Sequence, residues 1–266
     1  MKQLFFFDID GTLIDCNKDI YSIQTSTRSA LDQLKEQGDD VFLATGRCKC
    51  FIVDGVMDYP FSGYVTCNGA YVEYQGKCVY KNIIPSEAIQ KTHELCLERN
   101  MAYYFEGNDY IYVLNKTNPK PIEFKDNWGM KDETIVDSFD FKNIKTYIGM
   151  IVINSKEDIE PMVNALSPYF NIQRHQSEFS FDLTLRGESK AKGILELVKH
   201  LNRSIQDTVA FGDGRNDIEM LSEVGLGIAM GNAAIEAKHV ADFITDDVDK
   251  DGIVKALHHF SLLKPR

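Results

Sequence analysis

Short apolar runs alternate with amphipathic segments in the first eighty residues of the chain. Residues 3–7 and residues 41–44 are continuously apolar, as is typical of buried strands. Between them, residues 22–37 carry apolar side chains at helical spacing, and Gly38 follows as a helix-ending glycine. A strand, a helix and a second strand of these lengths predict a right-handed parallel crossover.

The same alternation returns in the last eighty residues. Helical spacing is found in residues 192–201, 218–224 and 234–240, and apolar strand-like runs in residues 208–211, 227–230 and 242–245. Two further short strands, 63–67 and 70–74, flank Asn68-Gly69, a strong turn signal. Repeated strand–helix units predict an α/β fold with a mostly parallel sheet.

The middle of the chain follows another pattern. A helix is predicted from residue 85 to residue 100 with Ser86 as its N-cap, and strands follow at 102–105 and 110–114. After a poorly periodic stretch, residues 115–143, the pattern recurs as a strand at 148–153, a helix at 157–166, and strands at 171–174 and 179–185. A helix followed by two strands thus appears twice. We predict an inserted α+β domain at residues 82–185 within a core formed by residues 1–81 and 186–266.

Length and composition limit the classes of protein. The chain has 266 residues, which suits one large domain or a domain with an insertion. Its net charge of −11, without a run of Lys or Arg, argues against a nucleic-acid partner. No apolar run approaches the ~20 residues of a membrane span. We expect a monomer or weak homo-oligomer that acts on a small molecule.

The six cysteines also bear on where the protein works. No signal peptide is apparent at the start, so we expect free thiols and a cytoplasmic location. Cys48-Lys49-Cys50 could form half of a metal site, but no second Cys or His pair completes it.

Polar motifs follow the predicted core strands. In open α/β sheets, ligands bind at the carboxyl edge of the strands, so residues distant in sequence can converge there. The motifs are Asp8-Ile9-Asp10-Gly11-Thr12-Leu13, Thr45-Gly46-Arg47, Ser189-Lys190-Ala191-Lys192-Gly193 and Gly212-Asp213-Gly214-Arg215-Asn216-Asp217.

These four motifs, in this order, resemble those of the haloacid dehalogenase-like hydrolases, and among them the Cof-type sugar-phosphate phosphatases with a type IIB cap. The likeness extends through Met230-Gly231-Asn232-Ala233 and Asp251-Gly252-Ile253, and it includes the position of the insertion. It implies a Rossmann-like core with an inserted α+β cap domain, a Mg²⁺ ion and a phosphoaspartate intermediate.

The resemblance also implies roles for individual residues. Asp8 is the expected nucleophile, and Asp10 the acid and base that protonates the leaving oxygen and then activates water. Because a phosphate dianion repels a carboxylate, the site must also neutralise charge. The expected phosphate-binding residues are Ile9, Thr45, Gly46, Lys190 and Asn216, and the expected metal ligands are Asp8, Asp10, Asp213 and Asp217.

Several alternatives stay open. Asp213 and Asp217 could cap the following helix, Lys192 competes with Lys190, and Arg47 and Arg215 have no settled role. In the insertion, substrate contact is a minority hypothesis for four residues: Arg174, His175, Glu178 and Trp128. As functions, a sugar phosphomutase or a non-catalytic sugar-phosphate-binding protein compete with a phosphatase. The binding protein should have lost one of the four motif residues Asp8, Asp10, Lys190 and Asp213, and all are present.

Overall fold

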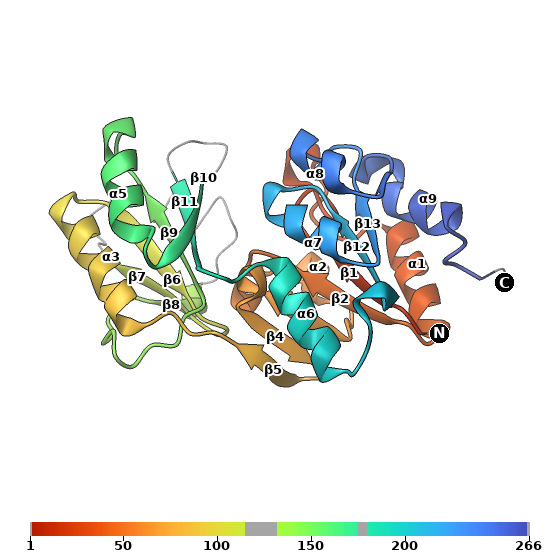
Figure 1. The fold of residues 1–266 in the computed structure, drawn as a ribbon, viewed down its shortest axis with the longest axis horizontal. Helices are drawn as coiled ribbons and strands as arrows, with labels where there is room; N and C mark the ends of the chain where they lie inside the picture. The colour runs from red at the N-terminus through yellow and green to blue at the C-terminus, as the bar shows by residue number, and fades with distance from the viewer. Residues whose placement is uncertain (1, 115–131, 175–179, 265–266) are drawn as a thin grey trace. The chain divides into compact units, whose positions relative to one another are not determined.

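The computed structural model describes residues 2–114, 132–174 and 180–264 (Figure 1). The chain folds into two compact units. The first contains Met1–Gly46, Ile52–Tyr80 and Ser189–Arg266, and the second contains Arg47–Phe51 and Lys81–Glu188. The five residues Arg47–Phe51, which begin with the last residue of the second motif, therefore group with the inserted segment.

The first unit is built on a mostly parallel sheet of eight strands in the order β14-β13-β12-β1-β2-β3-β4-β5. β1 lies between two parallel neighbours, and Phe6 aligns with Ala210 on one side and Phe42 on the other. The strands are β1 (Leu4–Phe7), β2 (Asp40–Ala44), β3 (Gly63–Thr66), β4 (Tyr71–Tyr74), β5 (Lys77–Lys81), β12 (Thr208–Gly212), β13 (Leu226–Ala229) and β14 (Phe243–Ile244).

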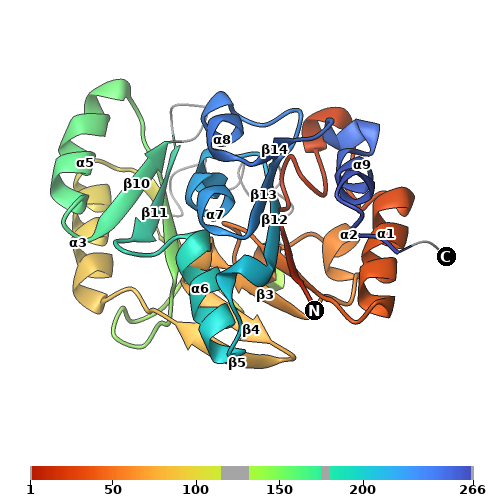
Figure 2. The same cartoon turned by 45° about the vertical axis from the view of Figure 1, so that its right-hand side comes forward.

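Helices cover both faces of this sheet, with α1 and α9 on one face and α6 and α7 on the other (Figure 2). Phe5 and Phe7 pack in the cluster of the first face, and Leu4 and Phe6 in that of the second. All four are fully buried, which explains the unbroken apolar run. The predicted α/β class is confirmed. The helices are α1 (Thr25–Glu36), α2 (Asp54–Met57), α6 (Lys190–His200), α7 (Ile218–Glu223), α8 (Ile235–Val240) and α9 (Gly252–His259).

The second unit is a six-stranded sheet in the order β10-β11-β9-β6-β7-β8. Two helices, α3 and α5, pack on one face against Tyr103, Phe105 and Ile151 (Figure 1). The repeated helix–strand–strand pattern is confirmed as α3-β6-β7 and α5-β10-β11. The elements are α3 (Ser86–Glu98), β6 (Ala102–Glu106), β7 (Ile111–Leu114), β8 (Ile135–Val136), β9 (Ile148–Val152), α5 (Ile159–Leu166), β10 (Phe170–Arg174) and β11 (Ser180–Leu185).

Some local expectations are wrong. Ser86 is the first residue of α3 rather than its N-cap, and Pro85 occupies the cap position without a side-chain hydrogen bond. The sequence pattern also missed β5 and α9. Trp128, His175 and Glu178 lie outside the described residues. Among the helices that the structure describes, none is both long and apolar enough to cross a membrane.

Candidate active site

Two neighbouring strands each end in an aspartate. β1 ends at Phe7 and is followed by Asp8, whose N–H continues the ladder to the carbonyl of Phe211 at 3.0 Å. β12, its parallel partner, ends at Gly212 and is followed by Asp213. Parallel pairing therefore brings together two carboxylates that are more than two hundred residues apart in sequence.

Lys190 reaches this pair from the start of α6. Its ammonium contacts Asp8 Oδ1 and Asp217 Oδ1, each at 2.6 Å, and its side chain is fully buried. Ser189 caps the helix by accepting the N–H of Lys192 at 3.2 Å. Lys192 itself pairs with Glu196 on the helix surface. The structure thus places Lys190, and not Lys192, beside Asp8.

A tight turn lets α6 come this close. Gly69 adopts a φ of +92°, and a Cβ there would lie 1.9 Å from the carbonyl oxygen of Ser189. A side chain at this position would push away the residue that precedes Lys190, so glycine is required by both conformation and space.

Both carboxylate oxygens of Asp217 accept hydrogen bonds. Oδ1 accepts from Lys190, and Oδ2 accepts the N–H groups of Asp213 and Gly214 at 2.9 and 2.8 Å. Asp217 is fully buried. It therefore both orients the Lys190 ammonium and fixes the loop that carries Asp213.

The electrostatics of this group are unbalanced, because three acidic side chains share one lysine. Burial raises the pKa of Asp8, and Lys190 offsets this only in part. Burial also raises the pKa of Asp213, with further contributions from the charges of Asp8 and Asp217. For Lys190, burial lowers the pKa, but the two carboxylates and their hydrogen bonds outweigh it and hold it above the usual range.

A bound cation would compensate the charge of these three carboxylates. Carboxylate oxygens of Asp8, Asp213 and Asp217 lie within 4.8 Å of one another. Gly11, with φ +83°, makes room for Asp213, since a Cβ there would lie 2.1 Å from Asp213 Oδ2. An all-oxygen set with excess negative charge suits a hard divalent ion. The residues present therefore fit a metal at this point.

A second group lies at the ends of β2 and β3. Thr45 is buried, and its carbonyl accepts the N–H of Asn68 at 3.1 Å. Asn216 donates to Asn68 Oδ1 at 3.2 Å, and a Cβ on Gly46 would lie 3.0 Å from the same oxygen. The predicted residues Thr45, Gly46 and Asn216 are thus joined through Asn68.

From the sequence, Asn68 is expected only to form a turn with Gly69. The structure places it in a 3-10 turn directly after the parallel strand β3, buried and with a φ of +50°. Its position at a strand end was the signal that could have identified it, since the other motifs share that position.

The turn that carries Ile9 and Asp10 is stabilised by its own backbone and by a distant asparagine. The carbonyl of Ile9 accepts the N–H of Leu13 at 3.0 Å, and Gly11 donates to Ile14 at 2.7 Å. Asn232 donates to the carbonyl of Gly11 at 2.7 Å. The exposed Asp10 adds negative charge that helps to raise the pKa of both Asp8 and Asp213.

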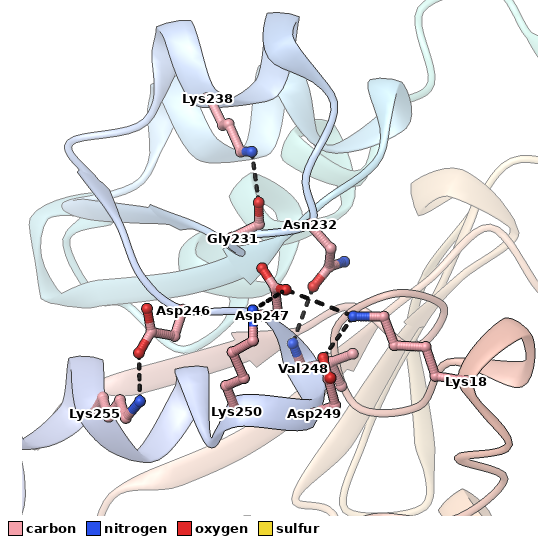
Figure 3. A network of polar contacts seen from close by, with 10 residues as sticks. All are labelled: Lys18, Gly231, Asn232, Lys238, Asp246, Asp247, Val248, Asp249, Lys250 and Lys255. Carbon is pink, nitrogen blue, oxygen red and sulfur yellow. Dashed lines mark hydrogen bonds and ion pairs between the residues drawn. The ribbon is translucent and has the colours of Figure 1, made fainter.

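Asn232 joins this turn to the C-terminal part of the chain. Its Oδ1 accepts the N–H of Val248 at 3.0 Å, as Figure 3 shows. Asn232 belongs to a motif that carried the family resemblance but had no predicted role. Its two bonds give it one, because they tie the loop after β1 to the loop after β14.

The three arginines whose roles the sequence left open lie in other surroundings. Arg215 is exposed and pairs with Glu236 at 2.9 Å. Arg47 is buried in the second unit, where it donates to the carbonyl of Phe51 at 3.1 Å and stacks over the Phe51 ring. Arg174 lies over Phe181. These contacts hold the three side chains against other residues of the protein.

The chain is similar to known proteins of one family. The family model for haloacid dehalogenase-like hydrolases matches residues 5–257. A Bacillus subtilis (strain 168) protein, YkrA, provisionally named a phosphatase, is 33% identical, with 99% of each chain covered.

Solved structures give the same result. The subclass IIB sugar phosphatase BT4131 is similar with a TM-score of 0.85 and 31% identity, over 98% of this chain and 100% of that one. A hypothetical protein of Geobacillus kaustophilus HTA426 has a TM-score of 0.88 and 34% identity, over the same shares.

Proposed function

The chain belongs to the haloacid dehalogenase-like hydrolases, and from this premise we propose that it is a Mg²⁺-dependent phosphatase of small phosphorylated metabolites. One observation carries the proposal. The Lys190 ammonium is held in a fully buried position between Asp8 and Asp217, at the edge of the sheet where ligands bind. A buried ammonium beside a carboxylate nucleophile is what attack on a phosphate dianion needs.

The reaction proceeds through Asp8. Its carboxylate attacks phosphorus in line with the ester oxygen, and Lys190 offsets the charge of the transferring phosphoryl group. We assign to Thr45, Asn216 and the N–H groups of Ile9 and Gly46 the task of holding the phosphoryl oxygens. Asn68 keeps Asn216 in place, because it accepts one of the Asn216 N–H groups.

Asp10 moves the proton. It donates to the leaving oxygen as the ester bond breaks, and it then takes a proton from the water that hydrolyses the phosphoaspartate. The exposure of Asp10 suits a group that must meet both a leaving alkoxide and water. Asn232 stabilises the turn in which Asp10 lies, through the carbonyl of Gly11.

Mg²⁺ would be held by the carboxylates of Asp8 and Asp213 and by the backbone carbonyl of Asp10, and would neutralise charge between nucleophile and phosphate. We propose that Asp217 reaches the ion through water, because both of its oxygens already accept hydrogen bonds.

Sugar phosphates are the proposed substrate class. BT4131, which the chain resembles over its whole length, is a sugar phosphatase. A sugar phosphomutase would use the same residues to return the phosphoryl group to the sugar. A non-catalytic sugar-phosphate-binding protein would bind these esters without turnover.

The test is a panel of phosphate esters, including hexose phosphates, assayed with and without Mg²⁺. Release of inorganic phosphate from wild type, and its loss by more than roughly 10,000-fold in Asp8→Asn, would support the proposal. Asp249→Asn, which changes an exposed carboxylate, is the matched control and should keep full activity. An isomeric sugar phosphate without phosphate release would favour the mutase. Binding without turnover, or an active Asp8→Asn, would overturn the mechanism.

A further inference from the structure

The Cys48-Lys49-Cys50 segment has no role in the proposed reaction, yet its two thiols lie close together. Their sulfur atoms are 3.3 Å apart. A 3-10 turn at Lys49–Phe51 holds this geometry, with the N–H of Phe51 donating to the carbonyl of Cys48 at 3.0 Å. A disulfide requires about 2.05 Å between sulfurs, so closure needs a shift of only about 1 Å.

The inserted unit holds this pair in place. The N–H of Cys50 donates to the carbonyl of Asn108 at 3.2 Å, and its sulfur lies 3.9 Å from the carbonyl of Gly107. Glu106, at the end of β6, accepts hydrogen bonds from both the thiol and the N–H of Cys48. The end of one strand and the loop after it thus fix both cysteines.

The two thiols differ in access, as sequential oxidation requires. Cys50 is partly exposed, whereas Cys48 is fully buried beside the Glu106 carboxylate. An oxidant from solvent meets Cys50 first, and Cys48 is then placed to resolve the product.

From this arrangement we propose that Cys48 and Cys50 form an oxidation site, at which a hydroperoxide converts the dithiol to a disulfide next to the phosphate-binding loop. The Cys50 thiol ionises, its sulfur attacks the terminal oxygen of the hydroperoxide, and the O–O bond breaks. Hydroxide or alkoxide leaves and takes up the proton that the thiol released. The Cys48 sulfur then attacks the Cys50 sulfenic acid, whose OH leaves as water. In total, two thiols and one hydroperoxide give one disulfide, one molecule of water and one molecule of alcohol (a second water where the oxidant is hydrogen peroxide), and two electrons pass to the peroxide.

Glu106 supports the second step. Burial raises the pKa of its carboxyl to about 7, although the hydrogen bonds from Cys48 and the charge of Arg47 lower it in part. Near neutral pH, a large fraction of Glu106 is therefore ionised and can take the Cys48 proton as the S–S bond forms.

The effect on the site rests on the proposed function. Thr45 and Gly46, which we assign to phosphate binding, are joined to Cys48 through Arg47 alone. Closing the disulfide pulls the Cys48 sulfur from Glu106 and tightens the turn that begins there. We expect the oxidised protein to lose roughly tenfold in kcat/KM, equivalent to about 1.4 kcal/mol.

The first arm of the test needs no enzyme activity. Hydrogen peroxide is added to the full chain, free thiols are alkylated, and mass spectrometry locates the loss of two hydrogens. We expect it between residues 48 and 50 in wild type and in a variant with the exposed cysteines replaced, Cys16→Ser with Cys78→Ser. Oxidation of Cys16 and Cys78 while Cys48 and Cys50 stay reduced would overturn the proposal, whatever the fate of the proposed function.

The second arm measures phosphate release. Wild type should lose activity with peroxide and regain it with dithiothreitol, while Cys50→Ser should start at wild-type activity and keep it. Cys50→Ala serves as a second variant and should behave in the same way. A disulfide that forms without a change in kcat/KM would overturn the effect on the site. The absence of phosphatase activity from the untreated, reduced protein would instead count against the proposed function.

Discussion

Two groups of lysines and aspartates in the first unit form ion pairs of the same kind, but they differ in burial and in net charge. In the Lys190 cluster, which comprises Lys190, Asp8, Asp213 and Asp217, one fully buried ammonium faces three carboxylates. In the Lys18 cluster, which comprises Lys18, Lys250, Asp247 and Asp249, two partly exposed ammoniums face two carboxylates (Figure 3).

The difference separates a binding site from a surface network. Charges that stay in water are screened and interact weakly, whereas buried charges cost free energy unless they are compensated. The Lys18 cluster is already neutral. The Lys190 cluster carries excess negative charge and is largely buried. This uncompensated charge indicates that a cation binds there.

The largest effect should come from Lys190→Met. The change leaves Asp8 and Asp217 buried without their ammonium, so we expect the free energy of unfolding to fall by ~3–5 kcal/mol. We expect kcat to fall by roughly 100- to 1,000-fold, through the loss of charge stabilisation. Urea unfolding and steady-state kinetics measure the two. A variant with unchanged stability would show that the ammonium is not needed to compensate the buried carboxylates.

The excess negative charge should also make the Lys190 cluster dependent on metal. A chelator should abolish turnover and Mg²⁺ should restore it. Asp213→Asn should raise the Mg²⁺ concentration for half-maximal activity by more than about 100-fold, beyond the usual cost of losing an outer-shell partner. Asp247→Asn is the control from the Lys18 cluster and should leave that concentration unchanged. Turnover that survives chelation would contradict the metal site.

The carboxylate of Glu106 is buried and accepts hydrogen bonds from the thiol and the N–H of Cys48. Because its pKa is about 7 against an ordinary 4.5, the native state keeps a proton that the unfolded chain has released between these pH values. The free energy of unfolding should therefore fall as pH rises from about 4.5 to about 7, by up to about 3 kcal/mol.

Glu106→Gln should remove this pH dependence of stability. In denaturant titrations, the free energy of unfolding of the variant, relative to that of wild type, should therefore increase from about pH 4.5 to about pH 7. Glu98→Gln changes an exposed residue of α3 in the same unit and should run parallel to wild type. Parallel profiles for Glu106→Gln would contradict the raised pKa.

A smaller effect is expected at Asn232, which supports the turn of Asp10 without a charge of its own. Asn232→Ala should lower kcat by about tenfold, since about 1.4 kcal/mol corresponds to one hydrogen bond of this kind. Asn232→Asp keeps the acceptor for Val248 and loses the donor to Gly11. If the bond to Gly11 positions Asp10, both variants lose kcat with little change in KM. If kcat returns to the wild-type value in Asn232→Asp, the loss in Asn232→Ala comes from the hydrogen bond with Val248 instead.

The smallest effect is expected at Lys18. Lys18→Met removes the ammonium from Asp247 and Asp249, but both partners stay in water. The free energy of unfolding should change by less than about 0.5 kcal/mol, and kcat/KM should not change. A loss comparable to that of Lys190→Met would remove the distinction between the two clusters.

Much of the first unit could be predicted, because its strands are buried on both faces. The apolar run of β1 and the helical spacing of α1 are strong local signals, and both elements are confirmed within a few residues. The site benefits from the same regularity. Once the strand ends are located, Asp8 and Asp213 must lie at one edge of the sheet. The roles of these residues stay predictions.

What the sequence missed depends on contacts between distant parts of the chain. Asn68 and Asn232 act through single hydrogen bonds to Asn216 and Gly11, and no local pattern encodes such bonds. The Arg47–Phe51 segment groups with the inserted unit, where the N–H of Cys50 donates to the carbonyl of Asn108. The Ser86 prediction failed because Pro85 took the cap position and moved Ser86 into the first helical turn.

The place of β1 at the centre of its sheet has a consequence for synthesis. One neighbour, β2, leaves the ribosome soon after it, but β12 begins at residue 208. At ~5–20 residues per second, the edge of Leu4–Phe7 waits about 10–40 s for its partner. During this interval the nascent chain carries an open, apolar strand edge, so we expect the N-terminal segment to need protection from aggregation.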